Sequence, residues 1–180
     1  MNCTDALTAL NIIVATLGLM FIGITIYEYV RLKTIRNDFE NLSKRLREEN
    51  IAAQKAMHRI IASYSLSDPL GKIELLESAE KIDPTAFNLY NSIGYAWLSK
   101  GEQVRAANAF REATRLHPND KAGYFDLAYV YVLMNQPDLA LECLERAVQV
   151  DPSSAADLKD NPQFAAISAE TRYQRLTARP

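Results

Sequence analysis

The side chains that could do chemistry are few in this chain of 180 residues, and their spacing supports no catalytic or metal site. Its two cysteines, Cys3 and Cys143, stand far apart, and so do its two histidines, His58 and His117. Neither pair has the spacing of a metal-ligand motif or of a nucleophile beside its base. The sequence also contains no glycine-rich phosphate loop. We therefore expect no enzyme activity, no metal and no cofactor.

These side chains have simpler structural interpretations. Cys143 lies one helical turn before Ala147, and we expect it to be a small buried residue. His117 stands before a proline and is expected to support a helix end, whereas His58 is expected to be solvated. Nucleic-acid binding is not expected, because Lys and Arg form no stripe in the second half of the chain.

An apolar stretch near the N-terminus predicts a membrane span. Residues 6–27, 22 in number, contain no charged side chain, and as a helix they reach about 33 Å, which is enough to cross a bilayer core about 30 Å thick. A cleaved signal peptide would need a basic start and a small-residue cleavage site, and a buried core helix would rarely lack charges for so long. We predict a transmembrane helix at 6–30 after a short extracytoplasmic N-terminus at 1–5.

The charges that flank this stretch predict its orientation. Lys and Arg near a membrane end are retained on the cytoplasmic side, and here they follow the apolar stretch. The N-terminus should therefore face outward and the rest of the chain should lie in the cytoplasm. The lack of a targeting peptide and the compact architecture favour a bacterial inner membrane. The basic residues nearest the span are Arg31, Lys33, Arg36, Lys44, Arg45 and Arg47.

Residues 31–62 are predicted to form a charged juxtamembrane helix, because Pro and Gly are absent and helix formers dominate. Its apolar residues alternate in steps of three and four, the spacing of a short coiled coil. This stripe either self-associates or packs onto the repeat domain or another subunit. Eight basic and four acidic residues in 31–59 leave a positive excess that either attracts anionic lipid or is solvated. The stripe consists of Leu32, Ile35, Phe39, Leu42 and Leu46.

A period of 34 residues organises the rest of the chain, marked by Asp83-Pro84, His117-Pro118 and Asp151-Pro152. Each unit is predicted to be a helix, a tight turn and a second helix. Gly101 and Asn135 align at the turn, where a left-handed residue ends a helix. The same shift aligns aromatic with aromatic and small with small residues: Tyr90 with Tyr124, Trp97 with Tyr131, Ala106 with Ala140 and Ala113 with Ala147.

This pattern resembles the tetratricopeptide repeat. The resemblance implies an all-α solenoid of antiparallel helix hairpins, with repeats at 85–118 and 119–152 and a terminal cap at 153–180. Residues 53–84 are either a degenerate unit or a cap formed by the tail of the preceding helix, because Lys72 replaces the expected Ala. The motif residues are Tyr90-x2-Ile93-Gly94-x2-Trp97, Ala106, Phe110, Ala113 and Pro118, then Tyr124-x2-Leu127-Ala128-x2-Tyr131, Ala140, Leu144, Ala147 and Pro152. The cap is expected to use Leu158, Phe164, Ile167 and Leu176.

In tetratricopeptide domains the first helices of successive hairpins line a groove that binds peptides or helices. The resemblance therefore implies a protein partner that supplies a peptide or an amphipathic helix; intramolecular packing of Tyr95 and Tyr129 is the alternative. We expect a membrane-anchored adaptor or assembly factor, or else an accessory structural subunit of a larger membrane complex. The groove positions are Asn88, Asn91, Tyr95, Leu98, Ala122, Phe125, Tyr129 and Val132.

Overall fold

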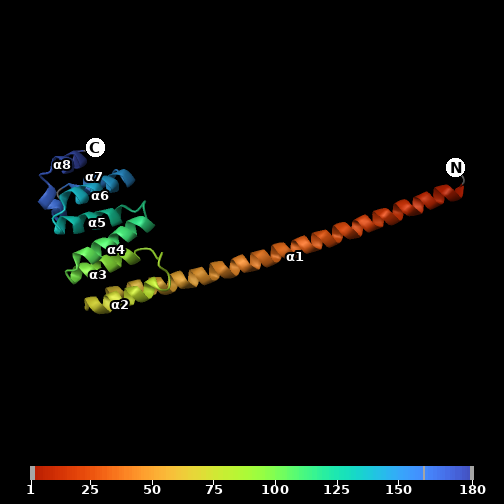
Figure 1. Ribbon diagram of the computed structural model, residues 1–180, viewed down its shortest axis with the longest axis horizontal. Coiled ribbons are helices and arrows are strands. Elements are labelled where there is room, and N and C mark those ends of the chain that lie inside the picture. Colours follow the sequence, from red (N-terminus) through yellow and green to blue (C-terminus); the bar gives the residue numbers. More distant parts are fainter. Residues whose placement is uncertain (1–2, 160, 179–180) are drawn as a thin grey trace. The chain divides into compact units, whose positions relative to one another are not determined.

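A computed structural model describes residues 3–159 and 161–178, and within these ranges every regular element is a helix (Figure 1). The predicted all-α class is therefore confirmed. The chain divides into two compact units, residues 1–50 and residues 51–180. The first unit is the greater part of helix α1 (Cys3–Tyr64), whose last turns belong to the second unit. Of the N-terminal segment predicted at 1–5, residues 1–2 lie outside the described ranges.

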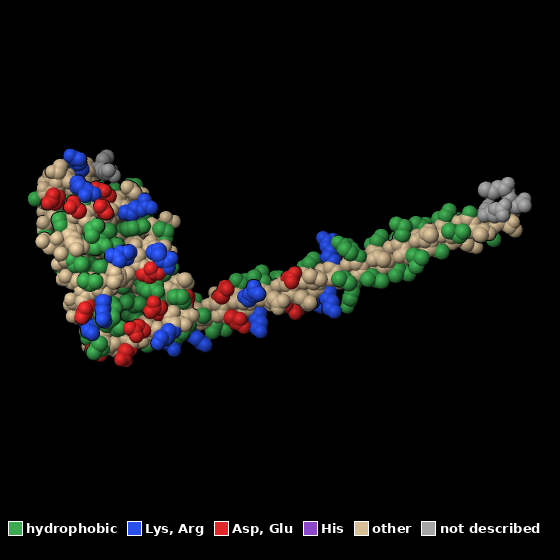
Figure 2. All heavy atoms as spheres, in the orientation of Figure 1, with side chains coloured by type: hydrophobic (Ala, Val, Ile, Leu, Met, Phe, Trp, Pro, Cys, Tyr) green, Lys and Arg blue, Asp and Glu red, His purple; other side chains and the backbone are tan. Residues whose placement is uncertain are grey.

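In the first unit, α1 exposes an uninterrupted apolar surface. All side chains from Leu7 to Val30 are exposed, and Figure 2 shows that charged groups begin only beyond the apolar stretch. The hydroxyls of Thr8 and Thr25 donate to carbonyl oxygens four residues earlier, at 2.8 and 2.7 Å, so the helix satisfies these polar groups itself. Among the described residues, α1 is the one helix long and apolar enough to cross a membrane, judged by length and composition.

The helix α1 continues without a break from the apolar stretch into the charged one. The division predicted between a membrane helix at 6–30 and a juxtamembrane helix at 31–62 is therefore a change of side chains and not of backbone. Pairs such as Arg36 with Glu40 and Lys44 with Glu48, at 3.9 and 4.0 Å, connect successive turns of the charged stretch.

The second unit stacks helices in antiparallel pairs (Figure 1). Residues 51–64 of α1 precede α2 (Pro69–Glu80), α3 (Leu89–Ser99) pairs with α4 (Gln103–Leu116), and α5 (Lys121–Leu133) pairs with α6 (Pro137–Val150). The short helices α7 (Ser154–Leu158), η1 (Pro162–Ile167, a 3-10 helix) and α8 (Thr171–Thr177) complete the unit.

The turns inside the two complete hairpins have the same geometry, as their alignment predicts. Gly101 and Asn135 have positive φ angles of 78° and 56°, so the left-handed conformation ends α3 and α5. The next amide then donates back into the helix: Glu102 to the carbonyl of Trp97 at 3.0 Å, and Gln136 to that of Tyr131 at 2.9 Å. The 34-residue period therefore extends to individual hydrogen bonds.

Small residues let the helices of these hairpins approach closely. Ala106, Ala128 and Ala140 are fully buried, and the ring of Phe110 lies against the backbone of Gly94. The α3–α4 and α5–α6 pairs are the most closely packed in the chain, whereas the backbones of α1 and α2 approach each other much less. Alanine and glycine at a helix crossing remove the side-chain volume that would keep two backbones apart.

The C-terminal segment covers the last hairpin. Leu158, Phe164, Ile167 and Leu176 are buried in one cluster with residues of α6. The hydroxyl of Tyr173 donates to the carbonyl oxygen of Leu158 at 2.6 Å, which joins α8 to the end of α7. These are the four apolar side chains expected to cap the repeats.

The contact between Gly94 and Phe110 yields a stability prediction. A Cβ atom at position 94 would lie 2.6 Å from Cε1 and Cζ of the Phe110 ring. Gly94→Ala should therefore lower the free energy of unfolding by about 1–3 kcal/mol, although alanine favours a helix by about 1 kcal/mol. Urea unfolding of the whole chain in mild detergent, followed by the fluorescence of the single tryptophan, Trp97, measures this.

A second substitution tests the cause. The next unit has Ala128 where this one has Gly94, and Leu144 where this one has Phe110. Gly94→Ala combined with Phe110→Leu should therefore cost less than the sum of the two single changes. Strictly additive costs would contradict the proposed clash.

Candidate binding groove

The first helices of the hairpins place apolar side chains at matching positions in the second unit. A shift of 34 residues brings Ile61 of α1 onto Tyr95 of α3, and Tyr64 of α1 onto Leu98 of α3. Ile61, Tyr64 and Tyr95 are 56%, 57% and 48% exposed. Large apolar side chains that share one exposed face are typical of a contact surface.

A hollow of about 370 Å³ opens beside Tyr64 and Tyr95, between α1, α2 and α3. Where α1 and α2 meet, Ile60 and Lys72 stand at the positions that Gly94 and Ala106 occupy in the α3–α4 hairpin. The backbones of α1 and α2 lie farther apart than those of α3 and α4, as larger side chains at a helix crossing favour. The hollow is lined by Ser63, Tyr64, Lys72, Leu76, Asn88, Ser92, Tyr95, Ala96 and Ser99.

A closed ring of hydrogen bonds forms one rim of this hollow. The side-chain amide of Asn88 donates to the Tyr64 hydroxyl at 2.9 Å. The Ser92 hydroxyl donates its one proton to the carbonyl oxygen of Asn88 at 2.8 Å, so Tyr64 must be the donor in its 2.8 Å bond to Ser92. The ring holds the end of α1 against the first turn of α3.

Tyr95 is fixed from two sides. Its ring packs edge-to-face on Phe110 with a centroid separation of 5.2 Å, and its hydroxyl donates to the carboxylate of Asp126 on α5. Burial raises the pKa of Asp126 to about 6, although the bond from Tyr95 acts to lower it. Burial, together with the bond to Asp126, raises the pKa of Tyr95. The half-exposed ring is therefore held in place before any ligand binds.

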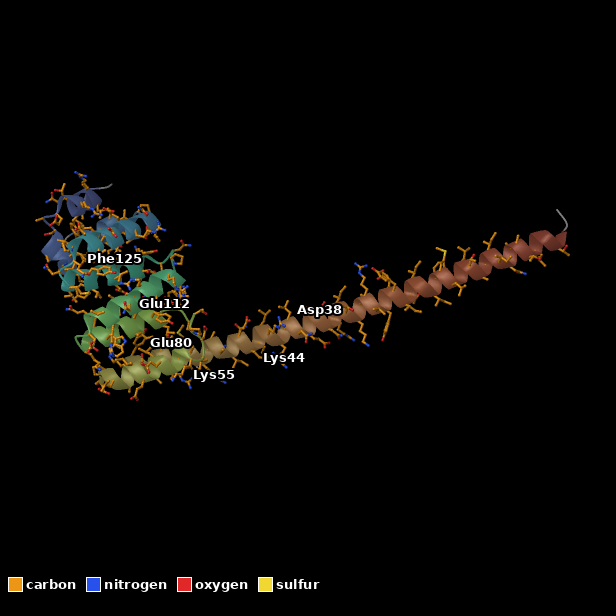
Figure 3. The ribbon with its side chains drawn as sticks, in the orientation of Figure 1. Asp38, Lys44, Lys55, Glu80, Glu112 and Phe125 are labelled. Atoms are coloured by element: carbon orange, nitrogen blue, oxygen red, sulfur yellow. The ribbon has the colours of Figure 1, made fainter. Side chains whose placement is uncertain are left out.

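The groove positions toward the C-terminus are less accessible. Leu98, Tyr129 and Val132 are partly buried and pack against the core of the last hairpin. The ring of Phe125 on α5 (Figure 3) lies 6.0 Å from that of Phe164, so the cap packs against this end. The open part of the predicted groove therefore lies between α1 and α3, and its continuation on α5 is largely filled by the protein itself.

Two of the expected groove positions differ sharply in exposure. Ala122 at the start of α5 is exposed, as expected. Asn91 was expected to be exposed as well, but it is 8% exposed and lines a void of about 10 Å³ beside Ala113 and Gly123. Its register directs it toward the neighbouring hairpin, and no hydrogen-bond partner of its Oδ1 atom is found among the described residues. The expected exposure of Asn91 is therefore wrong.

The juxtamembrane stripe of the first unit is fully accessible. Its five side chains, Leu32, Ile35, Phe39, Leu42 and Leu46, are between 51% and 70% exposed. The charged residues Asp38 and Lys44 project from the same helix (Figure 3). An apolar stripe on a single helix gains stability only when another surface covers it.

Several side chains that line the hollow were not predicted as groove residues. Tyr64, Ser92 and Lys72 all belong to it, and Tyr64 and Lys72 lie within residues 53–84. The 34-residue shift would have found Tyr64, because it aligns that residue with Leu98. Nothing in the spacing indicates that Lys72 is accessible, since the aligned residues of the other hairpins are buried alanines.

A second, acidic hollow of about 310 Å³ is lined by residues of α2, α3 and α4, with Glu80 and Glu112 among them (Figure 3). The Tyr90 hydroxyl donates to Glu80 at 2.8 Å. Burial, and to a lesser extent this bond, raise the pKa of Tyr90 to about 12. The Arg105 guanidinium covers the Trp97 ring at 4.5 Å. These groups are largely engaged with one another.

The isolated cysteine and histidine behave as structural residues. Burial raises the pKa of the Cys143 thiol to about 12, which keeps it protonated and unreactive near neutral pH. The ring of His117 packs edge-to-face on Phe87 at 5.6 Å, next to the end of α4. Among the described residues, no three His, Cys, Asp or Glu side chains gather as a metal site would require.

Comparison with known proteins agrees with this fold. Residues 98–166 match the model of a tetratricopeptide repeat family. Over 86 residues the chain is 30% identical to a cell division cycle protein 27 homolog of Caenorhabditis elegans. The matched region covers 48% of this chain and 11% of that protein. The chain therefore spans only about a tenth of that relative's length.

A solved structure has a similar fold. The crystal structure of MamA superimposes with a TM-score of 0.51 at 23% identity, covering 61% of this chain and 63% of MamA. At this identity the similarity concerns the fold alone. Residues 98–166 are thus similar to a tetratricopeptide repeat family, and proteins with such repeats generally mediate protein–protein interaction or assembly.

The bond between Tyr95 and Asp126 yields a prediction about pH. Because the pKa of Asp126 rises from 3.8 to about 6 on folding, the folded protein binds this proton more tightly than the unfolded chain does. The proton on Asp126 therefore stabilises the folded protein below about pH 4, and this stabilisation is lost as the pH rises to about 6. Asp126→Asn keeps an oxygen acceptor for Tyr95 and removes the buried charge. It should raise the free energy of unfolding by about 1–2 kcal/mol at pH 7.5 and change it little at pH 4.

Urea unfolding at the two pH values, again followed through Trp97, measures the difference. Glu142→Gln, which removes an exposed carboxylate of α6, is the matched control and should change neither value. A gain from Asp126→Asn of the same size at both pH values would mean that ionisation of Asp126 is not the cause.

Proposed function

We propose that this protein is a membrane-anchored adaptor or assembly factor that binds a partner protein through the face formed by α1 and α3. The observation that carries the proposal is the hollow of about 370 Å³ beside two half-exposed tyrosines. Tyrosine supplies a large contact area at a low cost in conformational entropy, and a concave site of this volume accommodates side chains of a peptide or helix.

The form of the ligand can be inferred from the surface. Ile61 and Tyr64 lie one turn apart on α1, and Tyr95 lies across the hollow on α3. An amphipathic helix or an extended peptide would cover these apolar groups and place one or two side chains in the hollow. A partner protein is therefore a better match than a small molecule, and a catalytic role has no support in the residues present.

Membrane anchoring is the second part of the proposal. The exposed apolar stretch of α1 needs a hydrocarbon environment, and Lys and Arg follow it on one side only. We infer that the N-terminus faces outward and that the repeats lie in the cytoplasm, at a bacterial inner membrane. The positive excess of residues 31–59 would then lie beside anionic lipid headgroups. Protease added outside intact cells should leave the repeats uncut.

A second candidate function is that of an accessory structural subunit in a larger membrane complex. The exposed stripe from Leu32 to Leu46 favours it, because such a stripe gains stability from a covering helix. That helix belongs either to another subunit or to a second copy of this chain. Association of the chain that rises with its concentration would favour the second copy, and a strict monomer would exclude it.

Anchoring predicts the effect of charges placed in the apolar stretch. Each arginine at the centre of a spanning helix costs about 2.5–3.5 kcal/mol. Leu17→Arg combined with Phe21→Arg should therefore release the protein from membranes washed at alkaline pH, whereas the wild type should remain in the pellet. The matched control, Leu42→Arg with Leu46→Arg, adds the same charges outside the span and should also stay in the pellet. Release of the wild-type chain by the same wash would exclude a spanning helix.

The groove predicts which surface captures a partner. The tagged chain is used to isolate proteins from detergent-solubilised native membranes, and the recovered proteins are quantified. Ile61→Ser with Tyr95→Ser removes the apolar contacts and should lower partner recovery about tenfold or more, since buried aromatic contacts dominate such interfaces. Val104→Ser with Leu139→Ser removes exposed apolar residues from the second helices of the hairpins and should leave recovery unchanged.

Correct folding of both double variants is checked through Trp97 fluorescence. Equal recovery by the wild type and both double variants would place the binding site outside the groove. That result would favour the function of an accessory structural subunit.

A further inference from the structure

We propose that the hollow between α1, α2 and α3 binds the carboxylate of an Asp or Glu side chain of the partner, with the ammonium group of Lys72 as its counter-charge. This inference rests on the proposed function, because it assigns a chemical preference to the groove that the partner occupies. It concerns the degenerate first hairpin, which departs from the repeat pattern.

Lys72 occupies a position where the complete hairpins have a small residue. The aligned residues Ala106 and Ala140 are fully buried where the two helices of their hairpins cross. At this position Lys72 lines the hollow, and the backbones of α1 and α2 lie farther apart than those of the complete hairpins. Packing alone would favour alanine here, so the cation is a feature of the hollow and not of the core.

The hydroxyl groups around the hollow already donate their protons within the protein. Ser63 and Ser99 donate their hydroxyl protons to the carbonyl oxygens of Ile60 and Ala96, at 2.6 and 2.7 Å. The ring of Tyr64, Ser92 and Asn88 uses the protons of both its hydroxyls. A serine or tyrosine hydroxyl has one proton to donate, so these groups have none left for a ligand.

The donors that remain among the lining residues are the three N–H groups of the Lys72 ammonium and the second N–H of the Asn88 side-chain amide. Both groups complement an oxygen acceptor. The hollow therefore combines a free cation and a free amide donor with hydroxyl groups whose protons are already engaged, and an anionic oxygen is the ligand that this set favours.

The charge of the hollow also favours an anionic ligand. Among the described residues, Lys72 is the one charged side chain that lines the hollow. Within the described part of the chain, no carboxylate forms an ion pair with its ammonium. The carboxylate of Asp68 is engaged by the amides of Leu70 and Gly71, and that of Asp126 is covered by the Tyr95 hydroxyl. The single positive charge matches a monoanionic carboxylate better than a phosphate, which usually requires several cations.

The surroundings favour a side chain over a chain terminus. Exposed apolar residues continue the face on both sides of the hollow, with Ile61 and Tyr64 on α1 and Tyr95 on α3. A peptide that covers both sides passes over the hollow, and a Glu or Asp from its middle can reach down to Lys72. The expected ligand is therefore an apolar segment that carries one internal acidic residue.

The test is a selection from a displayed random library of 16-residue peptides, performed on the whole chain in nanodiscs of neutral phosphatidylcholine. Peptides enriched on the wild type should share one Asp or Glu flanked by aromatic or aliphatic residues. Lys72→Met keeps an unbranched side chain, one atom shorter, and removes its charge, so it should weaken the binding of an enriched peptide about tenfold. Lys72→Glu should shift the enrichment from acidic to basic residues at the same peptide position.

Two controls isolate the charge of the hollow. Lys81→Met removes an equal charge from the exposed C-terminal end of α2 and should leave the selected sequences unchanged. Trp97 fluorescence verifies that each variant is folded. Amidation of the peptide C-terminus should not alter binding, and a loss of binding on amidation would assign the hollow to a terminal carboxylate and overturn the proposal.

The remaining outcomes separate this inference from the proposed function. Apolar peptides enriched without an acidic residue, with affinities unaffected by Lys72→Met, would overturn the carboxylate site and leave the groove intact. Failure of the wild type to enrich any sequence would overturn the groove, and the carboxylate site with it.

Discussion

Two antiparallel helices can pack tightly only where small side chains let their backbones approach, and this constraint shapes the second unit. Gly94 with Ala106 and Ala128 with Ala140 satisfy it in the two complete hairpins, and each pair then offers the next one a continuous apolar surface. A single hairpin would bury too little of that surface to be stable, so stacking supplies the core. The last hairpin has no successor, and the cap takes its place through Phe164 and Leu176.

Between α1 and α2 this constraint is relaxed, and the two backbones lie farther apart. Ile60 is buried in the core together with Leu76 of α2, so the two helices still pack, but their backbones remain apart. The space left between them is the hollow, and the third side chain at this crossing, Lys72, lines it. The proposed binding surface therefore lies at the positions where the other hairpins pack tightly. Between α1 and α2 these positions carry larger residues.

Most of the fold was predictable because it depends on spacing. The 34-residue period fixed the hairpins, and the left-handed turns at Gly101 and Asn135 follow from residue type. The accessible groove was less predictable. Asn91 matches the groove register but is buried, because exposure depends on how closely the next hairpin packs. Phe125 is partly covered because the cap packs against it. Neither the burial of Asn91 nor the covering of Phe125 follows from the 34-residue repeat of the sequence.

The polar residues around α3 are difficult to explain by stability alone. Asn91 has a buried oxygen for which no partner is found among the described residues, and such a group costs about 1–3 kcal/mol. The raised pKa of Asp126 means that its charge is also a cost at neutral pH. Lys72 replaces an alanine that would let the first hairpin close. Residues that lower stability at their own position are often found at functional sites. Lys72 and Asp126 both lie near Tyr95. A domain selected only to hold its helices together would have no reason to keep a free cation and a half-buried carboxylate beside the same half-exposed aromatic ring.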